Sequence, residues 1–419
     1  MIDGSHPANY DVVIVGARVA GSSLALLLGR LGHRVLLIDR ASFPSDTLST
    51  HFIGPAAVPL LARLGVLADV EAVGFRRITR CRTVVEDCIF EGPHAANGGY
   101  ALAPRRDALD AILIEHARRQ ESVEFCEQTR ADGLLWDAGR VVGAIVVTPD
   151  GERRGVRASV VVGADGKYSK LARWVEAAHY HEVPALRPAY YGYYRGLAPL
   201  PEPAIEMYFV NGRIGFVFPM QPGLDCLALE VQPEDADDFK ADRRAAFEKC
   251  FCALPTMASR FAGAQLDGKI FGTLGIANYF CQPYGPGWAL TGDAGYLKDP
   301  ITGMGIGDAL NQAIWLAEAL DAVFSGADWD ATLSEFHRRR DETLLPAFQA
   351  TVQMAQMRSA PPEAVAWMRA ALSNPSFGRI LASVLCTALP DLMPAPMQPR
   401  LRQVAAAFGA SPAAGVLTE

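Results

Sequence analysis

Residues 10–40 carry side-chain types at a spacing that could bind the pyrophosphate of a nucleotide. Their glycine turn reads Gly16-Ala17-Arg18-Val19-Ala20-Gly21. Gly16 leaves room for a tight bend, and Gly21 lets a following helix pack close to the preceding strand. The N-terminus of that helix would present free N–H groups and the positive end of its dipole to a pyrophosphate. Asp39 lies where a carboxylate would accept the hydroxyls of an adenosine ribose.

Arg18 stands where the common G-x-G-x-x-G pattern has its middle glycine. Its guanidinium could lie along the phosphates or could point to solvent, and the sequence leaves both alternatives open. A strand, a glycine turn and a helix also occur in α/β proteins that bind no dinucleotide. This stretch alone therefore favours nucleotide binding without establishing it.

Two later stretches follow buried strands and add carboxylates beside glycines. The first reads Gly163-Ala164-Asp165-Gly166, and the second is Gly292-Asp293. Beyond them, a loop from Pro300 through three alternate glycines leads into a helix predicted from about Asp308. The loop could be only a flexible turn, but the aspartate upstream favours a backbone that approaches a ligand closely.

No arrangement of side chains stands out as catalytic. The sequence shows no Ser/His/Asp or Cys/His set and no carboxylate pair placed as acid and base, so the catalytic residues stay unassigned. His51 lies in a loop rich in hydroxyl side chains, where it could be an ordinary surface residue or could lie beside a bound ring. The eight cysteines include no C-x-x-C pair and no zinc-ligand spacing, so we expect no metal site.

The elements that must position these residues belong to two kinds of sheet. A parallel core is predicted from strands 12–15, 34–38 and 288–291, a helix from 106 to about 120, and strands between 123 and 162. Residues 184–231 form aromatic-rich strands, which indicates an antiparallel sheet with a bulky apolar face. Asn211-Gly212 predicts a tight hairpin within it. From residue 329 onward the pattern is helical.

Composition excludes some classes of function. The net charge of −7 and the pI of about 5.7 give no case for binding nucleic acid or an anionic membrane. No apolar run reaches the roughly 18 residues that a membrane span needs. Residues 1–9 lack the basic and apolar regions of a signal peptide. Because the cysteines are scattered through apolar segments, we expect free thiols in a reducing, cytoplasmic setting.

The three motifs, in this order and spacing, resemble the fingerprints of the para-hydroxybenzoate hydroxylase-like FAD monooxygenases, the flavoprotein aromatic hydroxylases. The resemblance covers roughly residues 10–350. It implies an α/β fold: an FAD-binding Rossmann-like parallel sheet domain of the glutathione-reductase type, an inserted antiparallel substrate-binding sheet and a C-terminal helical segment. We expect the FAD-binding domain in 1–77, 101–182 and 271–328, substrate-domain strands in 78–100, the substrate-binding sheet in 183–270 and the helical region in 329–419.

The resemblance also assigns cofactor contacts to positions of this chain. Residues from the first turn would meet the FAD pyrophosphate, and those after the second strand would meet the adenosine ribose. Arg106 would lie near the ribityl and phosphate chain, Asp165 is implicated in both FAD and NAD(P)H handling, and His51 would lie beside the flavin. The loop after Asp293 would pass its backbone beside the pyrimidine edge of the flavin. The implied cofactor-binding residues are Gly16, Ala17, Arg18, Ala20, Gly21, Asp39, Arg40, His51, Arg106, Asp165, Gly292, Asp293, Pro300, Gly303, Gly305 and Ile306.

By the same resemblance, FAD would be reduced by NAD(P)H, would capture O2 as a flavin C4a-hydroperoxide and would transfer one oxygen atom to a small molecule. The substrate is expected to be apolar, aromatic or polyketide-like. His51 and Tyr193 are candidates to contact a phenolic substrate. The side chains expected to line the substrate site are Tyr193, Tyr208, Phe216 and Phe218.

Other functions use the same fold and stay open as alternatives. A flavin-dependent halogenase is disfavoured because the W-x-W-x-I-P signature should fall near residues 212–219, where this chain has no tryptophan. A geranylgeranyl-reductase-like enzyme would reduce an isoprenoid-like double bond and consume no O2. A non-catalytic flavin-binding protein would show no steady oxidation of NAD(P)H. The sequence leaves a homodimer open.

Overall fold

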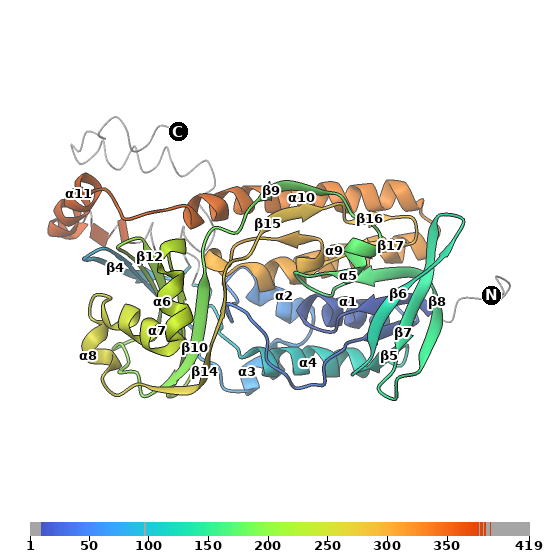
Figure 1. Ribbon diagram of the computed structural model, residues 1–419, viewed down its shortest axis with the longest axis horizontal. Helices are drawn as coiled ribbons and strands as arrows, with labels where there is room; N and C mark the ends of the chain where they lie inside the picture. The colour runs from blue at the N-terminus through green and yellow to red at the C-terminus, as the bar shows by residue number, and fades with distance from the viewer. Residues whose placement is uncertain (1–9, 96–97, 377, 380, 383–385, 387–419) are drawn as a thin grey trace. The chain divides into compact units, whose positions relative to one another are not determined.

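The computed structural model describes residues 10–95, 98–376, 378–379, 381–382 and 386 (Figure 1). The expectations for residues 1–9 and for most of the segment after residue 382 lie outside this range. The chain divides into two compact units. Unit 1 comprises Met1–Phe75, Ala103–Ala185 and Ile276–Leu345, and unit 2 comprises Arg76–Leu102, Leu186–Gly275 and Pro346–Glu419. The predicted helical region 329–419 is thus divided between the units.

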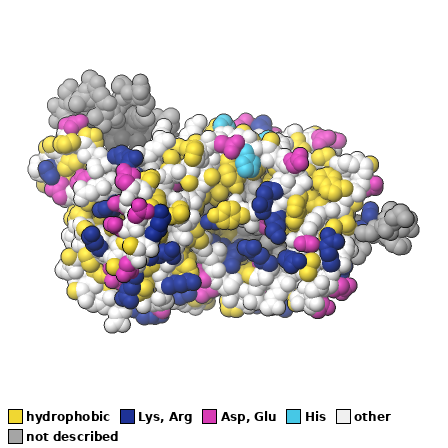
Figure 2. All heavy atoms as spheres, viewed as in Figure 1, with side chains coloured by type: hydrophobic (Ala, Val, Ile, Leu, Met, Phe, Trp, Pro, Cys, Tyr) yellow, Lys and Arg dark blue, Asp and Glu magenta, His cyan; other side chains and the backbone are white. Residues whose placement is uncertain are grey.

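The described residues carry charges of both signs on their surface. On the face shown in Figure 2, Lys and Arg side chains form separate groups with Asp and Glu side chains near them. No helix among the described residues is long and apolar enough to cross a membrane. Within the same part of the chain, no group of His, Cys, Asp and Glu side chains is arranged to hold a metal ion.

Unit 1 is built on the predicted parallel core, which the structure confirms. The strand order is β16-β17-β8-β1-β2-β5, and β1 pairs in parallel with β2 and with β8. Residues 12–15 of β1 and all of β2 are buried valine, isoleucine and leucine, and burial on both faces explains these continuous apolar runs. The strands are β1 (Tyr10–Val15), β2 (Val35–Ile38), β5 (Val123–Cys126), β8 (Arg153–Gly163), β16 (Tyr284–Gly285) and β17 (Trp288–Leu290).

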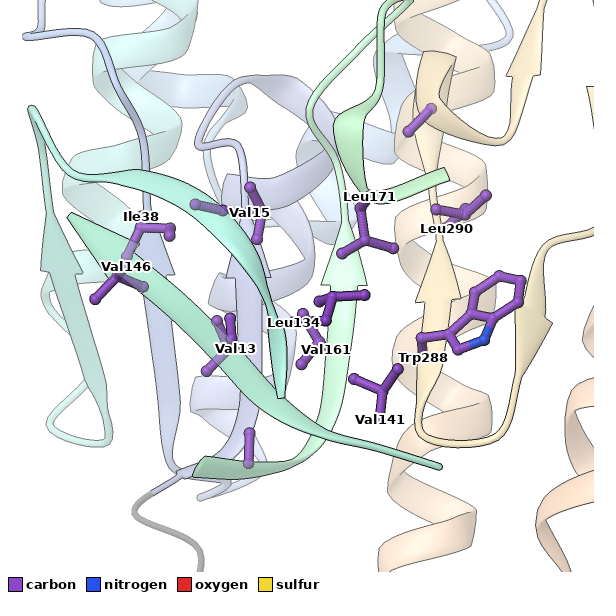
Figure 3. Close-up of a cluster of buried hydrophobic side chains, with 14 of the residues drawn as sticks. Val13, Val15, Ile38, Leu134, Val141, Val146, Val161, Leu171, Trp288 and Leu290 are labelled. Atoms are coloured by element: carbon purple, nitrogen blue, oxygen red, sulfur yellow. The ribbon is translucent and has the colours of Figure 1, made fainter. Parts of the chain in front are cut away.

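Helices pack on one side of this sheet and a β-hairpin covers the other. Helix α1 (Val19–Arg30) packs against α4 (Arg106–Arg118) and α9 (Gly305–Phe324). On the other side lies the hairpin of β6 (Arg130–Asp137) and β7 (Arg140–Val147), which pairs with β8. Figure 3 shows Leu134 and Val146 of the hairpin pointing toward side chains of the parallel strands, among them Val13 and Val161.

Shorter elements complete unit 1. Arg340 of α10 is fully buried and donates hydrogen bonds to the carbonyls of Cys281, at 3.0 Å, and Gly295, at 3.2 Å, so α10 is fixed to β15 and to the residue that follows the Gly292-Asp293 turn. These elements are α2 (Val58–Arg63), α3 (Leu67–Ala72), α5 (Lys170–Trp174), β9 (His179–Val183), β15 (Asn278–Cys281), η2 (Gly292–Ala294), β18 (Tyr296–Leu297), η3 (Pro300–Thr302) and α10 (Trp329–Ala355), the last of which extends into unit 2.

Unit 2 contains the predicted aromatic-rich sheet. Its strand order is β14-β10-β13-β12-β11-β3-β4, and most pairs are antiparallel, whereas β11 and β3 run parallel. Asn211 and Gly212 have φ of 50° and 73°, which confirms the tight hairpin between β11 and β12. The strands are β3 (Arg80–Val85), β4 (Cys88–Pro93), β10 (Ala189–Arg195), β11 (Ala204–Val210), β12 (Arg213–Gln221), β13 (Leu224–Glu230) and β14 (Gln265–Thr273).

One face of this sheet is covered by helices of the same unit. Phe239, Phe247 and Phe251 from α6 (Ala236–Ala241) and α7 (Arg243–Cys252) pack with Tyr190 and Tyr194 of β10. Their rings stack or tilt against one another, as for Tyr190 and Phe239 at a centroid distance of 4.1 Å. The remaining helices of unit 2 are η1 (Pro233–Asp235), α8 (Met257–Phe261) and α11 (Pro362–Ser373).

Candidate functional site

The first glycine turn leaves no room for side chains. Gly16 has a φ of +105°, and a Cβ added there would lie 2.3 Å from the carbonyl oxygen of Ala164. A Cβ added at Gly21 would lie 1.8 Å from the carbonyl oxygen of Gly16. Both glycines are therefore required by close backbone contacts, and the first contact brings the turn against the second motif.

Asp39 closes β2 and holds the turn in place. One carboxylate oxygen accepts a hydrogen bond from the backbone N–H of Ala17 and the other accepts from that of Ala41, both at 2.8 Å. Each carboxylate oxygen can accept more than one hydrogen bond, so capacity remains for the hydroxyls of a ribose. Arg40, which follows, is exposed.

Arg18 does not point freely into solvent. Its Nη1 atom lies 2.7 Å from the carboxylate of Asp110, and its Nη2 atom donates to the Ser45 hydroxyl and to the Asp46 carbonyl, each at 3.2 Å. About a quarter of the Arg18 side chain, 26%, is exposed. The solvent-facing alternative is therefore wrong, whereas the pyrophosphate contact stays a prediction.

Asp110 holds two arginines at once. Its carboxylate is fully buried and accepts hydrogen bonds from Arg106 at 3.0 to 3.1 Å as well as from Arg18. Arg106 and Asp110 are one helical turn apart on α4, so the sequence signal for this pair was present as an i,i+4 spacing. Sequence reasoning nevertheless missed Asp110. Two guanidinium groups share one carboxylate, which leaves one net positive charge beside the N-terminus of α1.

His51 lies near the same arginines and is fully buried. Burial and the charges of Arg106 and Arg105 lower the pKa of its imidazole to about 3, although a hydrogen bond with the Pro104 backbone acts in the opposite direction. The ring is therefore neutral at neutral pH and contributes no positive charge. Its backbone is left-handed, with a φ of 55°. A contact between this ring and a flavin stays a prediction.

The third motif brings Asp293 into the same region. Gly292 has a φ of +62°, and a Cβ added there would lie 2.8 Å from the Cβ of Ala20 in the first turn. The Asp293 side chain is exposed, yet burial by surrounding protein raises the pKa of its carboxyl to about 6. The charge of Arg106 lowers this pKa, so Arg106 and Asp293 lie within electrostatic reach of each other.

The glycine-rich loop differs in detail from its prediction. Pro300 opens the short helix η3, and Gly303 has a φ of +67° beside the ring of Phe52. Helix α9 begins at Gly305, three residues before the predicted start. A Cβ added at Gly305 would meet nothing within 4 Å, so the backbone here is open to a ligand. The neighbouring Ile306 is buried.

Asp165 has a structural partner in the second motif. Its carboxylate accepts hydrogen bonds from the Ser169 hydroxyl at 2.6 Å and from the backbone N–H of Lys170 at 2.7 Å. It therefore holds the start of α5, whose N-cap is Ser169. A role for Asp165 toward FAD or NAD(P)H stays a prediction.

The four expected substrate residues do not share one face of the sheet. Tyr208 belongs to the helix-covered core of unit 2, and its hydroxyl donates to the Glu206 carboxylate at 2.7 Å. Because side chains alternate along a strand, Tyr193, Phe216 and Phe218 lie on the opposite face. The rings of Phe216 and Phe218 stack at a centroid distance of 5.7 Å. Tyr208 is thus a core residue on the helix-covered face, away from the face that carries the other three expected substrate residues.

Known proteins with several different activities are similar to this chain in sequence. A brominase acting on 1H-pyrrole-2-carbonyl-[peptidyl-carrier protein], from Pseudoalteromonas luteoviolacea, is 26% identical over 355 residues, which are 80% of this chain and 82% of that protein. The digeranylgeranylglycerophospholipid reductase of Methanosarcina mazei is 28% identical and aligns with 76% of this chain and 77% of its own length. The 6-methylpretetramide 4-monooxygenase of Streptomyces rimosus is 33% identical over 177 residues, 41% of each chain.

The fold is also that of solved flavoproteins. The structure of a triple mutant of the flavin-dependent brominase Bmp2 superposes with a TM-score of 0.76 at 22% identity, covering 96% of this chain and 100% of that one. The family model described as an FAD binding domain matches residues 9–351. The chain therefore belongs to this FAD-binding family of flavin-dependent oxidoreductases.

Proposed function

We propose that the protein is an FAD-dependent monooxygenase that uses NAD(P)H and O2 to oxygenate an apolar, aromatic or polyketide-like small molecule. The observation that carries this proposal is the meeting of three motifs within unit 1. Gly16 lies against Ala164, and Gly292 lies against Ala20, so the pyrophosphate turn and the Asp293 turn are fixed in contact. This arrangement suits one extended dinucleotide.

The residues present fit FAD. The N-terminus of α1 and the guanidiniums of Arg18 and Arg106 would neutralise the pyrophosphate, and Asp39 would accept ribose hydroxyls. Asp293, which solvent reaches, would accept a hydroxyl of the ribityl or pyrophosphate portion. The open backbone at Gly305 would approach the flavin, with the start of α9 supplying N–H groups.

When bound and reduced, FAD would supply the activation of O2, and the flavin C4a-hydroperoxide expected from the family resemblance is part of this proposal. The protein's own contribution is to bind, to orient and to exclude water. The face of the unit 2 sheet that carries Tyr193, Phe216 and Phe218 has the apolar, aromatic character that such a substrate requires. The 6-methylpretetramide 4-monooxygenase, which is 33% identical over 177 residues, supports the reaction type.

Reduction of an isoprenoid-like double bond is a second candidate, because a lipid reductase aligns with three quarters of this chain at 28% identity. The two reactions differ in their use of O2. A monooxygenase consumes one O2 per product, whereas a reductase transfers hydrogen to its substrate anaerobically. We also infer a cytoplasmic location from the free state of all eight cysteines.

The test begins with the purified protein, which should release non-covalent FAD at about one per chain upon denaturation. A panel of phenols, polyketide-like aromatics and isoprenoid lipids is then incubated with NADH or NADPH under 18O2. Product heavier by one 18O atom supports the proposal. Saturated product formed without O2 would establish the reductase instead.

Two further arms test the remaining parts of the proposal. Bromide in the reaction mixture reports halogenation through a brominated product. A separate flavin reductase, added in place of direct NAD(P)H oxidation, reports whether the reducing equivalents arrive from a partner. Absence of FAD from the protein, even when FAD is supplied in excess, would refute the proposal at its root.

A further inference from the structure

A buried ion pair closes the glycine-rich loop of unit 1. The Nζ atom of Lys298 lies 2.8 Å from a carboxylate oxygen of Asp308, and the two side chains are only 4% and 6% exposed. Lys298 follows β18, and Asp308 lies in the first turn of α9. The pair therefore joins the two ends of the segment 299–307, which contains the predicted flavin-approaching backbone.

This pair is an unusual use of buried charge. Lysine is rarely buried so fully, and an ammonium and a carboxylate removed from water lose much of their hydration. Among the residues that the structure describes, neither Lys298 Nζ nor the Asp308 oxygen that faces it has a hydrogen-bond partner, so their contact is an ion pair without hydrogen-bond geometry. An ammonium carries three N–H donors, so donor capacity remains at this position.

The charges of the pair act on the predicted cofactor site. Asp308 raises the pKa of the Asp293 carboxyl, and Lys298 lowers it, so both groups lie within electrostatic reach of Asp293. Asp308 also raises the pKa of the Tyr296 hydroxyl, and Lys298 Nζ lies 5.6 Å from the Tyr296 ring centre. A carboxylate at the N-terminus of α9 opposes any anion held there, and Lys298 offsets that effect.

We propose that Lys298 and Asp308 are positioning residues that hold the 299–307 loop as a charge-balanced clasp and set the preference of the site for reduced over oxidised FAD. The inference rests on the FAD binding of the proposed function and not on oxygen transfer. Oxidised FAD takes up two electrons and one proton to give reduced FAD, whose negative charge lies near N1 and O2. The lysine favours this anion and the aspartate disfavours it. Removing the lysine charge and removing the aspartate charge should therefore change the preference for reduced FAD in opposite directions.

The experiment measures the two-electron midpoint potential of bound FAD, without substrate, by titration with a chemical reductant beside a reference dye. Lys298→Met should weaken the affinity for reduced FAD about tenfold relative to oxidised FAD, which lowers the potential by about 30 mV. Asp308→Asn should raise the potential by a similar amount. Lys298→Arg keeps the charge, so its midpoint potential should stay close to that of the wild-type protein. The same is expected of the double variant Lys298→Met/Asp308→Asn, in which both charges are removed.

The opposite signs separate this inference from a purely structural role. If the clasp only supports the loop, both single variants lose FAD affinity and stability alike, and their potentials stay unchanged or move in one direction. That outcome would overturn the inference. If Lys298→Met fails to fold, Asp308→Asn and Lys298→Arg still decide the matter, because the first must raise the potential and the second must not change it.

The inference and the proposed function fail in different ways. If the wild-type protein binds no FAD, the proposed function and this inference are both refuted. A protein that binds FAD and oxygenates a substrate, but shows no opposite shifts, removes only the inference. If the two single variants shift the midpoint potential in opposite directions but the protein never consumes O2 with substrate, the clasp is supported and the monooxygenase reaction is refuted.

Discussion

Replacing Asp110 by Asn removes the carboxylate that Arg18 and Arg106 share, and we expect two effects of opposite sign. The Asp110 side chain is fully buried and that of Arg106 is 10% exposed. Removing one partner of such a buried pair typically costs about 3–5 kcal/mol of folding free energy, because a charge is left without its counterion. The retained amide oxygen can still accept one hydrogen bond, so we expect the lower end, about 3 kcal/mol, for the apoprotein.

Binding of FAD should raise the free energy of unfolding more in this variant than in the wild-type protein. If both guanidiniums face the pyrophosphate, its negative charges replace the lost carboxylate, and the site for FAD becomes more positive. The free energy of unfolding is measured by denaturant titration without FAD and with saturating FAD. Asp107→Asn is the matched control, since Asp107 lies on the same helix and is a partly exposed partner of Arg105, and it should cost no more than about 1 kcal/mol.

Two results would refute this reasoning. A loss below about 1 kcal/mol in the Asp110→Asn apoprotein would show that the arginines do not depend on the carboxylate. If FAD raises the free energy of unfolding less in the variant than in the wild-type protein, the guanidiniums do not face the pyrophosphate. Because Asp110 is buried, added salt should change the first effect little.

The remaining predictions concern three other parts of the chain. Because the folded pKa of Asp293 is raised to about 6, apoprotein stability should fall as pH rises from about 4 through 6, and Asp293→Asn should remove this dependence; an unchanged pH profile would contradict the assignment. Asp293→Ala should weaken FAD binding by about 1–3 kcal/mol, as measured by titration of the apoprotein. Arg18→Gly should lower FAD affinity modestly and reduce its salt dependence, whereas an equal salt slope would confine Arg18 to the contacts with Ser45 and Asp110. Tyr208→Phe should lower stability without changing KM, whereas Tyr193→Phe should change KM with little loss of stability, and the reverse pattern would show that the two faces were assigned wrongly.

The local features of the fold could be predicted from sequence because each depends on a few neighbouring residues. The valine-rich run of β1, the glycine bend and Asp39 predict a strand, turn, helix and strand without reference to the rest of the chain. Asn211-Gly212 fixes its hairpin in the same way, because both residues tolerate positive φ. The predicted start of α9 lies three residues too far along the chain, because glycines have a low helix propensity. Packing against buried surroundings stabilises the helix over these residues all the same.

Features that depend on distant contacts could not be predicted. The i,i+4 spacing indicates that Arg106 pairs with Asp110, but the contact from Arg18 crosses 92 residues of sequence and exists only in the folded sheet. The face of Tyr208 was undecidable for a different reason. Strands β10 and β11 carry aromatic residues at both odd and even positions, so their alternation does not reveal which face the helices cover.

The same reasoning connects Asp110 and Asp308. Each is a buried carboxylate that neutralises a basic side chain near the predicted cofactor, and each therefore stabilises the empty site at the expense of an anionic ligand. Their replacement by Asn should make the apoprotein less stable and the FAD complex comparatively more favourable. They should differ in which part of FAD responds. Asp110 lies beside the pyrophosphate turn, so its loss should affect oxidised and reduced FAD equally and leave the midpoint potential unchanged. Asp308 lies at the start of α9, so its loss should favour reduced FAD and raise the potential. If Asp110→Asn raised the potential as much as Asp308→Asn, the two carboxylates would be acting through net charge alone, and the assignment of separate roles would be wrong.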